Sequence, residues 1–286
     1  MFISENSRVL VQGITGNQGS FHSKLMLEYG TNIVAGVTPN KGGMEIHGIP
    51  VFDTVQEALL KTKADTSIVF VPARFALDAV LESLNSGIKI ICIITENIPI
   101  FDMVRIIERA NELDAKIIGP NCPGILIPDK IKLGIMPSDL CHFGEVAVIS
   151  KSGTLSYEIT KSIGDAGIGV SAYVGIGGDP IRGTNMVEAV NYYSKDPNTK
   201  LIVLIGEIGG VEEEKTAGFI KENVDKPIIA YIAGKNAPRE KRMGHAGAII
   251  SGSRGTAQGK IKALRNVGVR IAETPWEIPN IIKDTI

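Results

Sequence analysis

The stretch VLVQGITGNQGSFHSKLML, residues 9–27, decides the fold of the first half of the chain. Three glycines, Gly13, Gly16 and Gly19, lie between an apolar run that predicts a strand and a segment that predicts a helix. Glycine lets backbone N–H groups approach a phosphate closely, and the start of a helix adds a partial positive charge. The stretch therefore predicts a phosphate cradle, with a tight turn that binds no ligand as the alternative.

Outside this stretch, short apolar, β-branched runs alternate with segments of helical periodicity along the chain. Continuous apolar strands separated by helices are typical of parallel sheets covered on both faces, and right-handed crossovers then give a doubly wound α/β fold. The strands that we expect are Arg8–Gln12, Asn32–Val37, Ser67–Val71, Lys89–Ile94 and Lys116–Ile118, then Glu145–Ile149, Val170–Val174, Lys200–Ile205, Pro227–Ile232 and Ala246–Ile250.

The alternation breaks between Gly119 and Gly144, where four prolines and four glycines occur in 26 residues. Such a stretch is typical of a connection between domains. A chain of 286 residues is also long enough for two domains. We therefore expect one domain over residues 1–140 and a second over residues 141–286.

Composition excludes several classes of protein. The 30 basic and 31 acidic residues give a net charge of −1, without the basic excess of a nucleic-acid-binding protein. Three cysteines without CxxC spacing predict neither a zinc site nor a disulfide framework. No secretory signal and no apolar run of about 18 residues is found, so we expect a soluble cytoplasmic protein without a membrane segment.

The strand that follows the first helix argues against NAD as the ligand. Dinucleotide sites usually carry an acidic residue at the end of this strand, which binds the ribose hydroxyl. Here Asn32–Val37 is followed by Thr38, Pro39 and Asn40, and no acid occurs before Glu45. Lys41, in the same glycine-rich loop, suits another phosphate, such as one on an adenosine ribose; a solvated loop lysine is the alternative.

Two further turns follow predicted strands of the first half. Ligands of open α/β sheets bind beyond the carboxyl ends of strands, so GPNCPG at 119–124 and ITENIP at 94–99 could border the same crevice. For Cys122 we favour a buried structural role over a chemical one. Glu96 could cap the next helix instead of contacting a ligand.

The second half carries an accessible histidine, His245, between Gly244 and Gly247. A strand delivers Ser152, Gly153 and Thr154 to a helix start, which can cap the helix or bind an anion. Glu207 ends another predicted strand, and its carboxylate could hold one imidazole nitrogen and leave the other nucleophilic. The alternative for Glu207 is a carboxylate in the first turn of a helix.

A third glycine-rich loop, in the segment YVGIGGDPIRGTN, follows another strand of this half. Together these features favour phosphoryl transfer through histidine, because helix ends can offset the phosphate charge without a metal in this chain. No G-x-x-x-x-G-K-[ST] loop is present, so a nucleoside triphosphate donor would be held elsewhere.

Seven segments in order carry a resemblance that covers about residues 8–274: QGITGNQGSFHS, GVTPNKGG, GPNCPG, SGTLSYE, VGIGGDP, IGEIGG and RMGHAGAII. They resemble the α subunits of succinate–CoA ligase (succinyl-CoA synthetase). The resemblance implies an N-terminal Rossmann-like CoA-binding domain followed by a flavodoxin-like doubly wound parallel-sheet domain. It implies that NTP phosphorylates a histidine, that phosphohistidine activates succinate as succinyl phosphate, and that CoA then forms succinyl-CoA and releases phosphate.

The resemblance also assigns residues and partners. It implies a partner β subunit, in an αβ or α2β2 assembly, that holds ATP or GTP with Mg²⁺ in an ATP-grasp domain. At Lys151 the chain departs from relatives with arginine, and a lysine would offer phosphate a point charge instead of a fork. The implied residues are Thr15, Gly16, Asn17, Gln18, Lys41, Ile94, Thr95 and Glu96 for CoA, His245 for phosphorylation, Glu207 for contact with the histidine, Tyr157 for substrate, and Ser152, Gly153 and Thr154 for phosphate.

Other functions remain open from the sequence. A related ligase for acetate or malate, or a citrate-cleaving enzyme, would share the histidine chemistry. Those relatives typically carry fused segments that 286 residues do not hold. A non-catalytic CoA-binding or redox-sensing protein would not need the second half. A nicotinamide dehydrogenase is disfavoured by the missing acid.

Overall fold

The computed structural model describes residues 3–238, 243–250 and 255–286. The chain divides into two compact units. The first contains the residues up to Gly124 together with Lys130–Ile135 and Ile181–Gly183. The second contains Ile125–Asp129, Met136–Pro180 and Thr184–Ile286. Neither unit is therefore one continuous segment of chain.

The first unit is built on a parallel sheet in the order β4-β2-β1-β5-β6-β7, with β3 antiparallel to β4 at the edge. Numbered along the chain, the parallel strands have the Rossmann order, which reverses between β1 and β5. The expected Rossmann-like fold is therefore confirmed. The strands are β1 (Val9–Gln12), β2 (Ile33–Val37), β3 (Glu45–Ile46), β4 (Ile49–Phe52), β5 (Thr66–Val69), β6 (Ile90–Ile93) and β7 (Lys116–Ile118).

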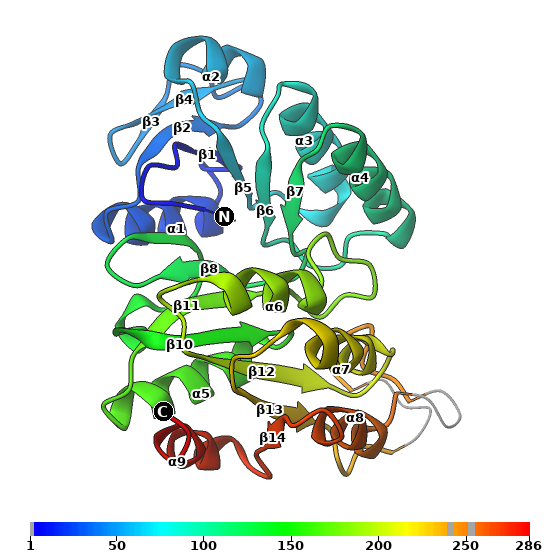
Figure 1. Ribbon diagram of the computed structural model, residues 1–286. Helices are drawn as coiled ribbons and strands as arrows, with labels where there is room; N and C mark the ends of the chain where they lie inside the picture. Colours follow the sequence, from blue (N-terminus) through cyan, green and yellow to red (C-terminus); the bar gives the residue numbers. More distant parts are fainter. Residues whose placement is uncertain (1–2, 239–242, 251–254) are drawn as a thin grey trace. The chain divides into compact units, whose positions relative to one another are not determined.

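Helices cover this sheet (Figure 1). Helices α2, α3 and α4 pack against one another in sequence, and α1 packs beside β9 (Ile131–Gly134). Buried residues of α3 and α4, including Val80, Leu84 and Ile106, share one apolar cluster with Leu10 and Ile91 of the sheet. The helices are α1 (Asn17–Glu28), α2 (Val55–Thr62), α3 (Ala73–Asn85) and α4 (Ile100–Glu112).

The second unit has a parallel sheet in the order β14-β13-β12-β10-β11, and β8 pairs antiparallel with β11. Numbered along the chain, the parallel strands have the flavodoxin-like order, with its reversal between β10 and β12. This part of the expected fold is also confirmed. The strands are β8 (Gly124–Ile127), β10 (Phe143–Ser150), β11 (Val170–Gly175), β12 (Leu201–Glu207), β13 (Ile228–Ala233) and β14 (Arg270–Ile271).

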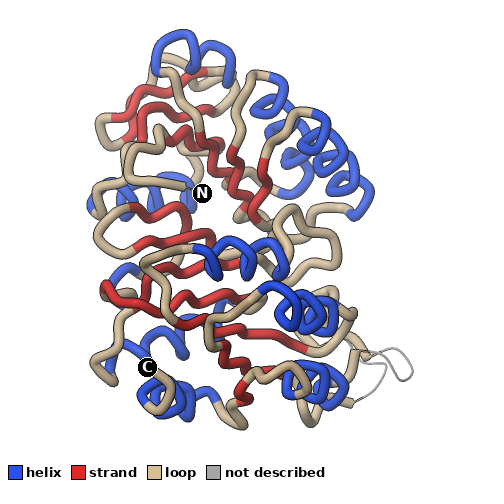
Figure 2. The backbone as a smooth tube through the Cα atoms, in the orientation of Figure 1, coloured by secondary structure: helices blue, strands red, loops and turns tan. Residues whose placement is uncertain are grey.

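Two helical layers enclose the second sheet, whose strands are drawn in red in Figure 2. Helix α7 packs against both α6 and α8 in one layer, and α5 packs with α9 in the other. Strands β11 and β12 are buried throughout, and β10 is buried from Val146 to Ser150, as expected for a sheet covered on both faces. The helices are α5 (Gly153–Asp165), α6 (Met186–Lys195), α7 (Glu212–Asn223), α8 (Ala257–Arg265) and α9 (Ile278–Lys283), with short 3-10 turns at Ser138–Leu140 and Pro275–Glu277.

One predicted strand is wrong. Residues 246–250 form a turn and an irregular segment. The backbone bonds to itself there: Ala248 N–H donates to the His245 carbonyl and Met243 N–H donates to the Ala248 carbonyl, at 3.1 and 2.9 Å. The other predicted strands are present with ends shifted by at most two residues. The strands β8 and β9 lie in the stretch that the sequence predicts as a connection.

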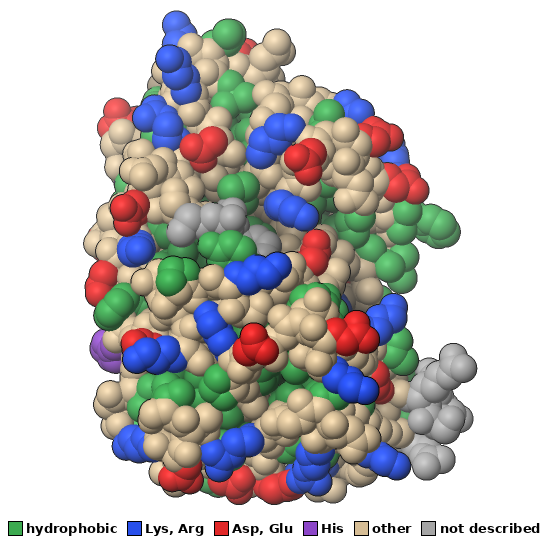
Figure 3. Space-filling model, viewed as in Figure 1, with side chains coloured by type: hydrophobic (Ala, Val, Ile, Leu, Met, Phe, Trp, Pro, Cys, Tyr) green, Lys and Arg blue, Asp and Glu red, His purple; other side chains and the backbone are tan. Residues whose placement is uncertain are grey.

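Among the described residues, no helix is long and apolar enough to span a bilayer. On the face drawn in Figure 3, acidic and basic side chains are interspersed without a continuous basic patch. This distribution agrees with the net charge of −1.

Thr31 ties β9 to the first unit, which yields a prediction about stability. Its buried hydroxyl donates to the Lys132 carbonyl at 2.7 Å and accepts from the Lys132 N–H at 3.2 Å. Replacement by valine removes both bonds inside the protein, so Thr31→Val should lower the free energy of unfolding by about 1–3 kcal/mol. Thr31→Ser keeps the hydroxyl and should cost about 1 kcal/mol or less. Denaturant titration followed by circular dichroism measures both; equal losses would contradict the assignment.

Candidate functional site

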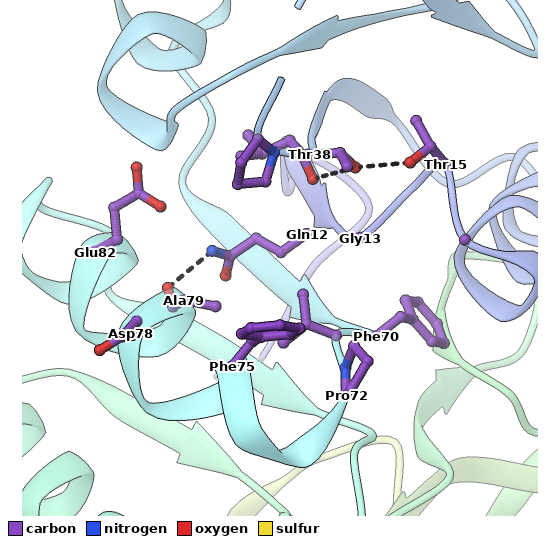
Figure 4. A pocket seen from close by; sticks show the side chains of 14 residues that line it. Gln12, Gly13, Thr15, Thr38, Phe70, Pro72, Phe75, Asp78, Ala79 and Glu82 are labelled. Atoms are coloured by element: carbon purple, nitrogen blue, oxygen red, sulfur yellow. Dashed lines mark hydrogen bonds between the residues drawn. The ribbon is translucent and has the colours of Figure 1, made fainter. Parts of the chain in front are cut away.

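A pocket of ≈670 Å³ opens in the first unit where strand order reverses. Its wall is formed by residues that follow β1, β2 and β5, together with one face of α3. In Figure 4, Phe70, Pro72 and Phe75 line one side, and Thr15 and Thr38, joined by a 3.2 Å hydrogen bond, lie on the other. The pocket thus has the size and the mostly apolar wall of a small-molecule site, at the place where doubly wound sheets bind ligands.

The glycine-rich turn beside this pocket needs its glycines. Gly13 has φ of +82°, and a Cβ on Gly19 would lie 2.2 Å from the Gly13 carbonyl oxygen. No side chain caps the start of α1 and its first turn contains no acid. The backbone N–H groups of that turn are therefore suited to an anion. Thr15 and Gly16 lie in the pocket wall, and Asn17 and Gln18 are exposed in the first turn of α1.

The other predicted ligand residues of this unit lie around the pocket but outside its wall. Lys41 is exposed, and Asp53 fixes its loop by accepting from the Lys41 and Gly42 N–H groups at 2.9 and 2.8 Å. Ile94, Thr95 and Glu96 follow β6, and the Thr95 hydroxyl donates to the carbonyl of Val71, a wall residue, at 2.6 Å. The sequence did not identify the wall residues Phe70, Val71, Pro72 and Phe75; only the strand order places them beside the glycine turn.

The environments of Cys122 and Glu96 differ in burial. Cys122 is buried and its thiol donates to the Ile93 carbonyl. The neighbouring Cys122 thiol and burial raise the pKa of Cys92, so that thiol stays protonated. Glu96 is exposed and no side chain caps the start of α4. Among the described parts of the chain, no cluster of three or more potential metal ligands occurs.

In the second unit, His245 lies against the end of β12. Its Nδ1 donates to Oε2 of Glu207 at 2.7 Å, because an ionised carboxylate can only accept. Glu207 is the last residue of β12 and is 8% exposed. In a neutral ring this bond places the proton on Nδ1, and the lone pair is then on Nε2. The ring thus lies at the carboxyl edge of the sheet, next to the reversal of strand order.

Two glycines allow the histidine loop to approach this closely. A Cβ on Gly178 would lie 2.2 Å from His245 Nδ1, and one on Gly209 would lie 1.9 Å from the Gly247 carbonyl oxygen. Gly178 belongs to the loop after β11, and Gly209 follows β12. The loops after β11 and β12 thus both contact the histidine loop through their backbones.

The start of α5 lies at the same edge, after β10. Ser152 caps the helix, its hydroxyl accepting from the Leu155 N–H at 3.3 Å. Gly153 is half-buried, Thr154 is exposed and Tyr157 is half-buried one turn further along. The first turn of α5 carries no acid, so its N–H groups form a partial positive charge at the helix start. The interaction of this charge with an exposed anion is worth about 0.3–1 kcal/mol.

The side chain of Lys151 is buried. It is 4% exposed and its ammonium group pairs with Glu212 at 2.9 Å and with Glu213 at 2.8 Å. Burial raises the pKa of Glu213, but Lys151 and Lys260 outweigh it and hold that pKa below its ordinary value. The lysine therefore acts inside a buried ion cluster beneath the site.

Sequence comparison matches both halves to known families. Residues 4–97 match the family model described as CoA binding domain, and residues 149–270 match the one described as CoA-ligase. The chain is 52% identical over 278 residues to succinate–CoA ligase [ADP-forming] subunit alpha 1 of Archaeoglobus fulgidus, covering 97% of this chain and 95% of that relative. It is 50% identical over 280 residues to the corresponding alpha subunit of Aquifex aeolicus, covering 97% and 92%.

Solved structures share the fold. A variant of Methanosaeta concilii ATP citrate lyase in complex with (3S)-citryl-CoA superposes with a TM-score of 0.90 at 26% identity, over 99% of this chain. The match covers 50% of that longer chain. A dinucleotide-forming acetyl-coenzyme A synthetase of Ca. Korarchaeum cryptofilum, with a TM-score of 0.74 and 23% identity over 94% of this chain and 58% of its own, shows the fold alone.

The contact at Gly178 yields a prediction about the ring position. Gly178→Ala should displace His245 and break its bond to Glu207, because the new methyl would overlap the ring. The downfield proton resonance of Nδ1–H, observed by NMR, should then be lost. Gly247→Ala is the matched control, since its Cβ would meet no atom closer than 3.4 Å. An unchanged resonance in Gly178→Ala would refute the described contact.

Proposed function

The chain belongs to the family of succinate–CoA ligase α subunits, and from that premise we propose that it forms succinyl-CoA from succinate, CoA and NTP through a phosphohistidine on His245. The observation that carries the proposal is the 2.7 Å hydrogen bond between His245 Nδ1 and Glu207. With Nδ1 held by the carboxylate, we assign the attack on phosphorus to Nε2.

The phosphoryl group moves in three steps. Nε2 of His245 attacks the γ-phosphorus of NTP and NDP leaves. A succinate carboxylate oxygen then attacks that phosphorus, the N–P bond breaks, and succinyl phosphate forms. The CoA thiolate finally attacks the acyl carbon, a C–S bond forms, and inorganic phosphate leaves.

The residues around His245 act on charge and position. As Nε2 becomes phosphorylated, the ring gains positive character, which the Glu207 carboxylate stabilises. The start of α5, with Ser152, Gly153 and Thr154, offsets the phosphate charge through its N–H groups. Tyr157, one turn along the same helix, is our candidate for contact with succinate.

The first unit supplies the CoA site in this proposal. The uncapped start of α1 and the turn with Thr15, Gly16, Asn17 and Gln18 suit the diphosphate. Lys41 suits the ribose phosphate, and the segment Ile94, Thr95 and Glu96 borders the site. The pocket of ≈670 Å³ with its aromatic wall offers room for an apolar or aromatic part of CoA.

The nucleotide is held by a partner in this scheme. The relatives are named as α subunits of an ADP-forming enzyme, which supports a partner β subunit. In our proposal that partner binds ATP or GTP with Mg²⁺. The ion would polarise the phosphate oxygens there. A function as a non-catalytic CoA-binding protein would not explain the hydrogen-bonded pair of Glu207 and His245.

The first test is labelling. The chain with its β partner and γ-labelled ATP should acquire an acid-labile, base-stable label, and His245→Asn should reduce the label to background. Asparagine preserves polarity and approximate size, so folding should persist, as circular dichroism would check. Normal labelling and turnover in His245→Asn would disprove the mechanism.

The second test concerns the ligand of the first unit. The isolated chain should bind CoA but not NAD in calorimetry, because no acid follows β2 to hold a nicotinamide dinucleotide ribose. Gly19→Ala should weaken CoA binding by about tenfold or more, since its methyl group would push the turn away from the phosphate. Micromolar NAD binding without CoA binding would restore the dehydrogenase alternative.

A further inference from the structure

A buried ion cluster lies beneath the histidine site. It consists of Lys151, which follows β10, Glu212 and Glu213 in the first turn of α7, and Lys260 in α8. Lys151, Glu213 and Lys260 are 4%, 1% and 0% exposed. Glu213 accepts from both lysines, one on each carboxylate oxygen. Two positive and two negative charges thus balance inside the protein.

The cluster is bonded directly to the backbone that presents Glu207. Oε1 of Glu213 accepts from the Glu207 N–H at 3.1 Å. Nζ of Lys260 donates to the Gly209 carbonyl at 2.6 Å. The two residues on either side of Ile208 are therefore each fixed by one member of the cluster.

From Gly209 the same chain of contacts reaches the histidine loop. Gly209 lies so close to the Gly247 carbonyl that no side chain fits between them. Glu207 itself bonds the His245 ring. The cluster thus fixes two groups that contact the histidine loop: Glu207, whose carboxylate bonds the ring, and Gly209, whose backbone packs against the loop.

Core stability alone does not account for such a cluster. Buried ion pairs cost desolvation energy, and apolar residues of similar volume often replace them without loss of stability. An ionised Glu213, in contrast, gives the Glu207 N–H a strong charge-assisted acceptor. These charges therefore serve to position the backbone at Glu207 more than to stabilise the fold.

We propose that Glu213, held between Lys151 and Lys260, is a positioning residue that sets the Glu207 carboxylate against Nδ1 of His245. This rests on the proposed phosphohistidine mechanism. Glu213 touches neither substrate nor the reacting nitrogen; it acts through Glu207. Small displacements of a catalytic group can cost about 100-fold in rate, so loss of this support should slow phosphorylation.

Two charge-matched double variants test the proposal in the complete α–β complex. Glu213→Gln with Lys260→Met keeps an oxygen for the Glu207 N–H, whereas Glu213→Met with Lys260→Met removes it. Each removes one positive and one negative charge, and Lys151 retains Glu212 in both. Their difference therefore reports on the bonds that this one oxygen accepts, from the Glu207 N–H and from Lys151.

The rate of His245 labelling by γ-labelled ATP, measured by rapid quench, should fall about tenfold or more in the Met–Met variant relative to the Gln–Met variant. The KM values for CoA and succinate should stay unchanged. The downfield Nδ1–H resonance should shift only in the Met–Met variant. Equal rates per folded site in the two variants, or an unshifted resonance in both, would overturn the proposal.

If the Met–Met variant does not fold, Glu213→Asp replaces it, because the shorter side chain keeps its charge but withdraws its oxygen from Glu207. A slowed rate supports the proposal and a wild-type rate overturns it. Absence of label on wild-type His245 would instead disprove the proposed function. The resonance comparison would still report on positioning, so the two failures are distinguishable.

Discussion

The geometry of the histidine site in the second unit depends on the hydrogen bond between His245 Nδ1 and Glu207 at 2.7 Å. The histidine belongs to a segment without regular structure, held by its own turn and by contacts with glycine backbones. An imidazole in such a segment would sample many orientations and both tautomers. The Glu207 carboxylate selects one ring orientation and one tautomer. Its own position is fixed by the end of β12.

Both units use the same feature of sheet topology for their sites. Where the strand order reverses, the loops of neighbouring strands leave the sheet on opposite faces and open a crevice. In the first unit this happens between β1 and β5, beside the pocket, and in the second between β10 and β12, beside Glu207. Two different tasks, ligand binding and histidine placement, thus follow from one rule of chain connection.

The sequence predicted what depends on local pattern. Apolar runs gave the buried strands, and glycines between strand and helix gave the turn at Gly13 and the start of α5. It failed where packing decides: residues 246–250 are apolar and β-branched enough for a strand, yet their backbone bonds within the loop. A lysine such as Lys260 also carries no local sign that it is fully buried, because its partners, Glu213 and the Gly209 carbonyl, are distant in sequence.

The contacts of Gly178 and Gly209 with the histidine loop have an evolutionary consequence. The Gly178 backbone contacts the His245 ring, and the Gly209 backbone contacts the Gly247 carbonyl. Any side chain at either glycine would overlap these atoms, so neither position can change through a series of gradually larger side chains. Divergence toward a new carboxylic acid would have to accumulate on other surfaces. The histidine geometry would then be inherited unaltered by descendants with different substrates.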